Sequence, residues 1–344
     1  MGYESGFAAI GIGVAYVIGF MIMIRYAGKI HSMGVKEKIY SFPHYLNLRF
    51  TNPEAEPRFA RMFSTMITGV NVFIFFFLLA AQFVAMASLL KFAFDVEYVY
   101  AAIISGVVII GYTAFAGLAG VIITDTVQFL IIVFMIIFIF IPGIWTDTVG
   151  LSRLAELPEK MVNGTAEGIA FLVALPLFLS WSVLVRMDIW QRVLAAKSDA
   201  VARKMSLWSG IGMLPFYLIF PLVGMTIRIT HGDHLISEDV TYLFLSDHSQ
   251  PVLLGFAVVG LLAALMSSGD SFLNIISIST ARDFLGFKHK EKNASQLQRS
   301  IRIISLVFGV LALFIALSFP KVVDLMVVGI SMIVIYTPIT LIEL

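Results

Sequence analysis

The chain has 344 residues, of which 59% are hydrophobic and 13% are charged, and its formal net charge is +1. A soluble domain carries about 25% charged and 45–50% apolar residues, so this composition indicates an integral membrane protein in a lipid bilayer. The small net charge gives no sign of a nucleic-acid partner, and the lack of cysteine excludes disulfides, thiolate metal sites and cysteine catalysis.

Nine segments are long and apolar enough to cross about 30 Å of hydrocarbon as α-helices. They are apolar on all sides, whereas the strands of a membrane barrel alternate in residue type over about ten residues. The sequence therefore predicts an all-α membrane protein, a polytopic bundle of about nine transmembrane helices. In chain order, the predicted spans are 7–25, 62–90, 98–115, 119–143, 166–185, 206–229, 251–280, 301–319 and 322–342.

Lysine and arginine are distributed unevenly over the connections between these spans. The connections after the first, fifth and seventh spans hold 7, 5 and 6 of them, 18 in all, against 5 elsewhere. The last of these basic connections includes Lys288, Lys290 and Lys292. Because cytoplasmic connections are enriched in Lys and Arg, the bias predicts a multi-pass plasma-membrane protein with its N-terminus outside and its C-terminal end cytoplasmic.

The two ends of the chain suggest a piece of a longer protein. The chain begins almost directly on a span and stops after the ninth span without a basic tail. We therefore expect a fragment of a longer, transporter-sized protein.

Asp125, in GVIITDTVQFLII, lies about one and a half turns into the fourth predicted span. An ionisable residue within a membrane span indicates a functional site by default. The alternative is a solvated helix start on the cytoplasmic side.

The fifth predicted span and the segment after it carry two further signals. Pro176, followed by Ser180, Trp181 and Ser182, predicts an interrupted helix whose freed carbonyls are available to an ion or a substrate. A simple kink is the alternative. The following stretch, RMDIWQRVLAAKSDAVARK (186–204), is amphipathic and basic, which predicts an interfacial helix held at anionic headgroups.

Polar residues interrupt the seventh predicted span in LLAALMSSGDSFLN (261–274). Ala264, Ser267, Ser268 and Ser271 recur at three- and four-residue spacing and so share one helix face. Two hydroxyls and a backbone carbonyl form a cluster of hard oxygens suited to a small cation such as sodium. Alternatively, the serines bond to carbonyls four residues earlier, or pack as small residues against a neighbouring helix.

Asp270 is the carboxylate of the same stretch. It lies roughly 28 Å along a helix that starts near Pro251, which predicts a partly hydrated position toward the cytoplasmic boundary. If Asp125 approaches the face of Ser267, Ser268 and Ser271, the two helices together form a cation site.

Three stretches in this chain together resemble the sodium:solute symporter family. They are GYTAFAGLAGVIITDTVQ (111–128), DIWQRVLAAKS (188–198) and LMSSGDSFLNIISISTARDF (265–284), with YSFPHYLNLRF (40–50) as a weaker fourth. The resemblance implies a five-plus-five inverted-repeat, leucine-transporter-like fold in a single transporter domain, 1–344. By this resemblance the chain would be N-terminally truncated and would hold core helices two to ten, with an incomplete first repeat at 1–143 and a second at 166–344.

The resemblance also implies site residues. One sodium ion would bind the carbonyl of Ala264 and the hydroxyls of Ser267 and Ser268. A second cation site would use Asp125 and Ser271, with Asp270 at a position where similar transporters carry a hydroxyl. The positions that match substrate-binding regions are Glu4, Ser180, Trp181, Ser182 and Tyr217.

The function implied by the resemblance is not enzymatic. It is secondary active transport, in which Na+ drives uptake of a small polar solute (a sugar, an amino acid or a carboxylate) by alternating access. One alternative is an intramembrane aspartyl protease with Asp125 and Asp270 as its catalytic pair. The other is a transporter-like sensor. The sequence does not identify the solute, choose between sodium and proton coupling, or set the oligomeric state.

Overall fold

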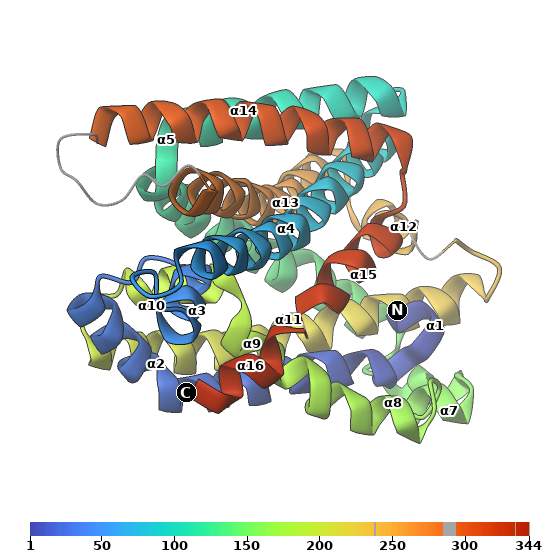
Figure 1. The fold of residues 1–344 in the computed structure, drawn as a ribbon. Coiled ribbons are helices and arrows are strands. Elements are labelled where there is room, and N and C mark those ends of the chain that lie inside the picture. The colour runs from blue at the N-terminus through green and yellow to red at the C-terminus, as the bar shows by residue number, and fades with distance from the viewer. Residues whose placement is uncertain (237–238, 285–293, 334, 344) are drawn as a thin grey trace. The chain divides into compact units, whose positions relative to one another are not determined.

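The protein is all-helical, and the prediction of that fold class is confirmed. The computed structural model describes residues 1–236, 239–284, 294–333 and 335–343, with the side chains of 115–122, 294, 339 and 341–343 excepted. These residues form helices almost throughout and no β-strand (Figure 1). The chain folds into two compact units. Unit 1 comprises Met1–Lys29, Leu130–Leu184 and Lys197–Leu261, and unit 2 comprises Ile30–Phe129, Val185–Ala196 and Leu262–Leu344.

Most helices are α-helices, and three short segments are π-helical. The π-helical segments are η2 (Ile136–Phe140), η4 (Leu175–Leu179) and η5 (Thr280–Phe284), and the 3-10 segments are η1 (Gly6–Ala9) and η3 (Ser152–Glu156). The α-helices are α1 (Gly2–Ser5), α2 (Ile10–Glu37), α3 (Phe42–Phe50), α4 (Pro57–Phe94), α5 (Tyr98–Met135), α6 (Ile141–Asp147), α7 (Glu159–Val162), α8 (Ile169–Ala174), α9 (Ser180–Val185), α10 (Met187–Leu194), α11 (Asp199–His231), α12 (Val240–His248), α13 (Pro251–Ser279), α14 (Ala294–Ser318), α15 (Val322–Ile333) and α16 (Tyr336–Glu343).

Each of the nine predicted spans overlaps an apolar helix of the described chain. Two helices joined by a bend of 46°, Ile169–Val185 and Met187–Leu194, are together long and apolar enough to cross a membrane. Tyr98–Ala114 and Val322–Pro338 are shorter apolar helices. Six helical stretches are by themselves long and apolar enough to cross a membrane: Gly2–Glu37, Pro57–Phe94, Ile123–Asp147, Asp199–His231, Pro251–Phe284 and Ser295–Ser318.

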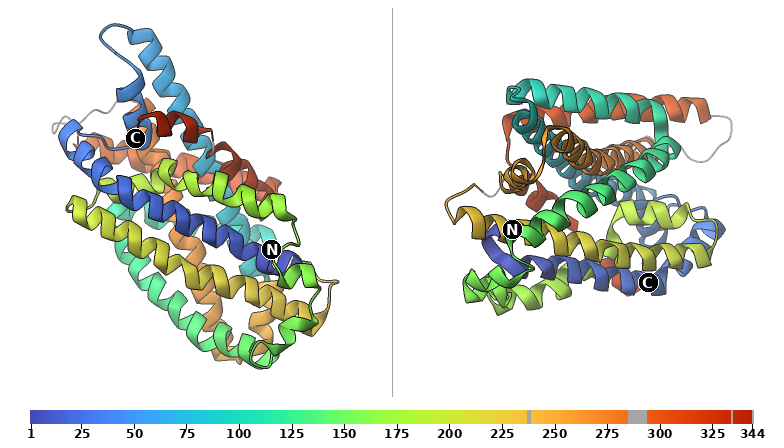
Figure 2. Two further views of the ribbon diagram at one scale, coloured as in Figure 1. Left: turned by 90° about the horizontal axis from the view of Figure 1, so that it is seen from below. Right: turned by 180° about the vertical axis from the view of Figure 1, so that it is seen from behind.

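Helix α5 contributes to one of these six stretches, Ile123–Asp147, and also contains the shorter apolar helix Tyr98–Ala114. Its ribbon changes direction between its ends (Figure 2), so we distinguish a first arm, 98–114, from a second arm, 123–135. The side chains between the arms lie outside the described residues, as do Lys288, Lys290 and Lys292 of the basic connection.

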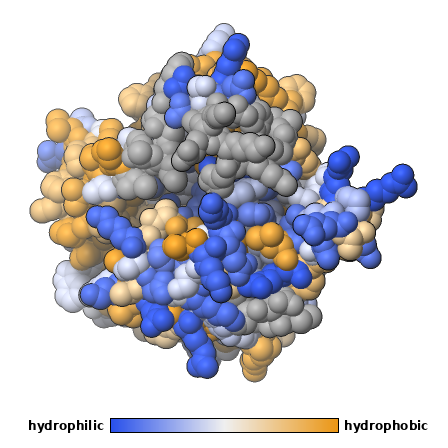
Figure 3. Space-filling view, turned by 60° about the vertical axis from the view of Figure 1, so that its left-hand side comes forward, coloured by the Kyte–Doolittle hydropathy of each residue, from blue (hydrophilic) through white to orange (hydrophobic). Residues whose placement is uncertain are grey.

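Exposed apolar side chains form a stripe along α14, which indicates contact with lipid. The stripe recurs at three- and four-residue spacing, the period of one helix face. In Figure 3, hydrophilic residues gather over the lower middle of the view and project at its right, and hydrophobic residues gather at its left. The α14 stripe consists of Ile303, Leu306, Val307, Val310, Leu311 and Phe314.

Helix α2 continues to Glu37, past the predicted end of its span at residue 25. Arg25 and Lys29 are exposed on one side of the helix, while Met23 and Ile30 are buried on another. The predicted boundary was too early because charged residues end an apolar run without ending an amphipathic helix.

In unit 1, the start of the chain, marked N in Figure 1, packs closely on the second half of α11. A Cβ atom at Gly2 would lie 2.3 Å from the carbonyl oxygen of Pro221, and one at Gly224 would lie 2.4 Å from the backbone nitrogen of Tyr3. The two backbones therefore meet where only glycine leaves room. The core nearby includes Met135, Ile139, Phe140, Val223, Ile227 and Phe244.

In unit 2, the first arm of α5 lies beside α14 (Figure 1). A Cβ at Gly309 would lie 2.5 Å from Cγ1 of Ile110, and the Tyr98 hydroxyl donates to the Ala316 carbonyl at 2.9 Å. These contacts hold the first arm, which carries one of the partners of the candidate site.

The prediction of a single interfacial helix over 186–204 is wrong. Helix α10 ends at Leu194, and α11 begins at Asp199. Ser198 is extended, and its hydroxyl accepts the Val201 N–H at 3.3 Å, which caps α11. The apolar face of α10 is buried in protein: Trp190 is fully buried, with its ring 5.2 Å from Phe42 and 4.9 Å from Tyr45 of α3.

The Ser198 cap leads to a prediction about stability. Replacing Ser198 by alanine is expected to destabilise the protein by about 1 kcal/mol, because a backbone N–H at the start of α11 loses its acceptor. Ser198→Asp keeps an acceptor and should preserve most of that stability. Thermal unfolding of both variants in detergent checks this, and equal losses in the two would contradict the capping role.

Candidate functional site

The polar residues of LLAALMSSGDSFLN lie on α13, which is continuous from Pro251 to Ser279. Ser267, Ser268 and Ser271 are half-buried. The Ser268 hydroxyl donates to the carbonyl of Ala264 at 3.4 Å. This is the back-bonding that serines make within helices, but it is at the long limit of a hydrogen bond. Both oxygens therefore keep lone pairs for another partner.

Asp125 comes to the same cluster from the second arm of α5. The Ser267 hydroxyl donates to its Oδ1, across 142 residues of sequence. Its Oδ2 lies 3.5 Å from Nη2 of Arg192 on α10, and its side chain is 23% exposed. A carboxylate oxygen and a serine hydroxyl from two helices are thus adjacent within unit 2.

Asp270 is fully buried, at 0% exposure, so the predicted partly hydrated position is wrong. Its depth was judged from its place along one helix, whereas its burial depends on neighbouring helices. Here the Tyr112 hydroxyl, on the first arm of α5, donates to Oδ2. Oδ1 is buried with no hydrogen-bond partner among the described residues.

The atoms of this cluster that could bind a cation are all oxygens. They are the hydroxyls of Ser267, Ser268 and Ser271, the carbonyl of Ala264, and the carboxyl groups of Asp125 and Asp270. Hard oxygens suit small, weakly polarisable cations. Within the described chain, no three His, Asp or Glu side chains come together as a transition-metal site would require. Oδ1 of Asp270, which has no hydrogen-bond partner among the described residues, adds a buried acceptor that a cation would satisfy.

Two residues that contact the cluster were missed in the sequence. Tyr112 pairs with Asp270, and Arg192 approaches both Asp125 and the Ser271 hydroxyl, the latter at 3.5 Å. Both lie within stretches that resemble the family, GYTAF and DIWQR, but neither stands out by periodicity. Only the packing of α5 and α10 against α13 shows their partners.

The end of α13 is tied to the segment before α3. Asp283, in η5, accepts from the Tyr40 hydroxyl at 3.0 Å and from the Ser41 hydroxyl at 3.4 Å. The Arg282 guanidinium lies 4.7 Å from the centre of the Tyr40 ring. Burial, and next the adjacent Asp283 carboxyl group, raise the pKa of the Tyr40 phenol well above its usual value. The phenol therefore stays a hydrogen-bond donor at physiological pH.

The residues predicted to contact substrate all belong to unit 1. Ser180 is fully buried, and its hydroxyl has no hydrogen-bond partner among the described residues. The Ser182 hydroxyl donates to the Leu179 carbonyl at 2.6 Å, and Trp181 is half-buried. The interruption predicted at Pro176 takes the form of a π-helical segment, η4, followed by the bend after α9.

The other two predicted substrate residues lie on different elements of unit 1. Tyr217 of α11 stacks on Tyr16 of α2, with ring centroids 5.8 Å apart. Gly13 permits this approach, since a Cβ there would lie 2.3 Å from Cβ of Tyr217. Glu4 of α1 is exposed.

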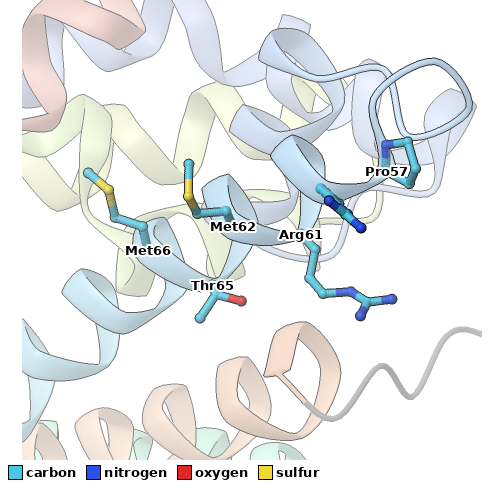
Figure 4. A pocket seen from close by; sticks show the side chains of 6 residues that line it. Pro57, Arg61, Met62, Thr65 and Met66 are labelled. Carbon is cyan, nitrogen blue, oxygen red and sulfur yellow. The ribbon is translucent and has the colours of Figure 1, made fainter.

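A separate pocket of about 690 Å³ lies at the start of α4 (Figure 4). Met62 and Met66 project to one side of the helix, and Arg61 and Thr65 to the other. None of the predicted site residues lines this pocket, so it is distinct from the cation cluster.

Comparison with known proteins identifies relatives along nearly the whole chain. The model of the sodium:solute symporter family matches residues 1–341. A sodium/proline symporter of Haemophilus influenzae is 27% identical over 92% of this chain and 64% of its own length. One from Staphylococcus aureus is 28% identical over 73% of this chain and 51% of its own. The chain thus spans less than two thirds of the length of these curated relatives.

One solved structure shows the same fold. A Na+-coupled sialic acid symporter in a substrate-bound outward-open state matches with a TM-score of 0.67 at 17% identity. The match covers 98% of this chain and 89% of that one.

Proposed function

This chain belongs to the sodium:solute symporter family, and we propose that it is part of a secondary active transporter in which sodium entry drives uptake of a small polar solute. It is a multi-pass membrane protein, and the family consists of transporters, not enzymes. We further propose the orientation from the charge bias, with the N-terminus of the chain outside and the C-terminal end cytoplasmic.

The observation that carries this proposal is the bond between Ser267 and Asp125, which joins hydroxyl and carboxylate oxygens of α13 and α5. We assign one sodium ion to the Ala264 carbonyl and the hydroxyls of Ser267 and Ser268. A second cation site uses Asp125, Ser271 and Asp270. Two observations support this assignment: the candidate ligand atoms are all oxygens, and Oδ1 of Asp270 has no hydrogen-bond partner among the described residues.

For the solute, the names of the relatives suggest where to begin. Two of them are sodium/proline symporters, so we propose an amino acid of the proline type as the first solute to test. Ser180, Trp181, Ser182, Tyr217 and Glu4 are the proposed contacts. The buried Ser180 hydroxyl supports such a role, because a solute could supply its missing hydrogen bond.

Coupling requires the cation to favour one conformation over another. A bound ion shifts the equilibrium between outward-open and inward-open states only by its difference in affinity for the two. We propose that sodium favours the outward-open state, and that rocking of one helix bundle against the other then exposes ion and solute to the cytoplasm.

We do not retain the intramembrane aspartyl protease. Family membership favours transport, and the two carboxyl groups bond to different partners among the described residues: Asp125 to Ser267, and Asp270 to Tyr112.

Uptake into proteoliposomes tests the proposed function. With an inward sodium gradient, we expect accumulation of proline or of another amino acid, sugar or carboxylate from a labelled panel. Replacing sodium by potassium should abolish the accumulation, as should a sodium ionophore that collapses the gradient. Uptake that proceeds equally without sodium would refute the proposal.

A further inference from the structure

Arg192 stands out because its guanidinium contacts two of the proposed cation ligands. Its Nη2 lies 3.5 Å from Oδ2 of Asp125 and 3.5 Å from Oγ of Ser271. These oxygens come from different helices, the second arm of α5 and α13. The positive charge of Arg192 therefore lies next to oxygens that a second cation would use.

The backbone that carries Arg192 is firmly held. Trp190 of α10 is fully buried against the rings of Phe42 and Tyr45, and the Phe42 N–H donates to the sulfur of Met187 at 3.2 Å. The Arg192 side chain, in contrast, is 56% exposed. Because the backbone is held and the side chain is exposed, the guanidinium can leave its partners without movement of the helix.

The other arginine beside α10 has its own carboxylate. Arg186 donates to Asp188 with Nε at 3.0 Å and with Nη2 at 2.7 Å, a two-bonded pair within the same segment. Asp188 thus already has a close local partner, whereas Arg192 reaches across to α5 and α13.

We propose that Arg192 is a tethered competitor of the second cation, a positioning residue that occupies Asp125 and Ser271 when the ion is absent and withdraws when it binds. This rests on the proposed function. Two positive charges are mutually repelled at the same carboxylate, so ion binding and the arginine contact exclude each other. Because exposed pairs of this kind are weak, sodium can displace the arginine. When the second cation is released, the returning guanidinium lowers the affinity of the site for that ion.

Neutral variants of Arg192 test the competition. Arg192→Gln and Arg192→Met should each lower the half-saturating sodium concentration for uptake by about three- to tenfold, because the ion no longer displaces a charge. They should also lower the maximal rate, because tighter binding slows ion release. Arg192→Lys keeps the charge and should stay close to the wild type. If Arg192 had a role in folding alone, its loss would not lower the half-saturating sodium concentration and the maximal rate together.

The matched control is Lys197→Gln, which removes the same charge from an exposed position close by in sequence. It should leave the sodium dependence unchanged. The proposed competition would be refuted if the half-saturating sodium concentration were unchanged or raised in both Arg192→Gln and Arg192→Met at normal expression. That outcome differs from failure of the proposed function, in which the wild-type protein itself shows no sodium dependence.

Discussion

Replacing Ser267 and Ser268 together by alanine is expected to raise the half-saturating sodium concentration for uptake by at least about tenfold. The double variant removes two proposed hydroxyl ligands of the cation, and contacts to a charged group contribute about 1.5–3 kcal/mol each, where 1.4 kcal/mol corresponds to tenfold. It also removes the hydroxyl that donates to Asp125. Uptake measured over a range of sodium concentrations gives the result directly.

A serine on the same helix supplies the control for this experiment. The Ser277 hydroxyl is buried and lies 2.7 Å from both the Leu273 carbonyl and the Ser305 hydroxyl. Ser277→Ala therefore removes a buried hydroxyl whose hydrogen bonds are made to residues other than the proposed cation ligands. We expect it to alter thermal stability and leave the sodium dependence unchanged. An unchanged sodium dependence in Ser267→Ala with Ser268→Ala would show that the proposed ligands are wrong.

Tyr112→Phe is expected to destabilise the protein by about 1–3 kcal/mol, the cost of leaving a buried polar group without its partner. The Tyr112 hydroxyl is the partner of Oδ2 of Asp270, and Oδ1 has none among the described residues. The variant thus leaves a fully buried carboxyl group deprived of that bond. Thermal unfolding in detergent, at one heating rate for all variants, measures the effect.

Two comparisons measure how much the contact between Tyr112 and Asp270 itself contributes to stability. In an Asp270→Ser background, Tyr112→Phe should cost much less, because residues in contact show a coupling that independent residues lack. Tyr98→Phe is the matched control on the same helix, since the Tyr98 hydroxyl donates to a backbone carbonyl, that of Ala316. Equal costs of Tyr112→Phe with and without the Asp270 side chain would mean that the pair does not stabilise the fold.

Local patterns in the chain were sufficient for the helices and for one face of the site. Apolar runs predict spans because crossing hydrocarbon requires a helix whose backbone bonds are internal. The spacing of Ser267, Ser268 and Ser271 places them on one side of α13 because the helical period is local. Motifs such as SSGDS and ITD, with their order along the chain, were enough to recognise the family.

The ends of the helices were less predictable than the helices themselves, because they depend on contacts that hydropathy does not describe. The end of α2 depends on which side of the helix faces solvent, so Arg25 and Lys29 do not stop it. The break before α11 depends on the Ser198 cap, a side-chain contact that hydropathy does not register. A similar limit applied to Asp270, whose burial is decided by helices other than its own.

Which side chains meet across the site was decided by tertiary structure alone. Ser271 and Arg192 are 79 residues apart, Ser267 and Asp125 are 142 apart, and Asp270 and Tyr112 are 158 apart. Composition and period describe neighbours within one helix, whereas these contacts depend on how three helices pack. The chain's residues therefore predict a cation cluster on α13, and only the packing supplies Tyr112 and Arg192 as its partners.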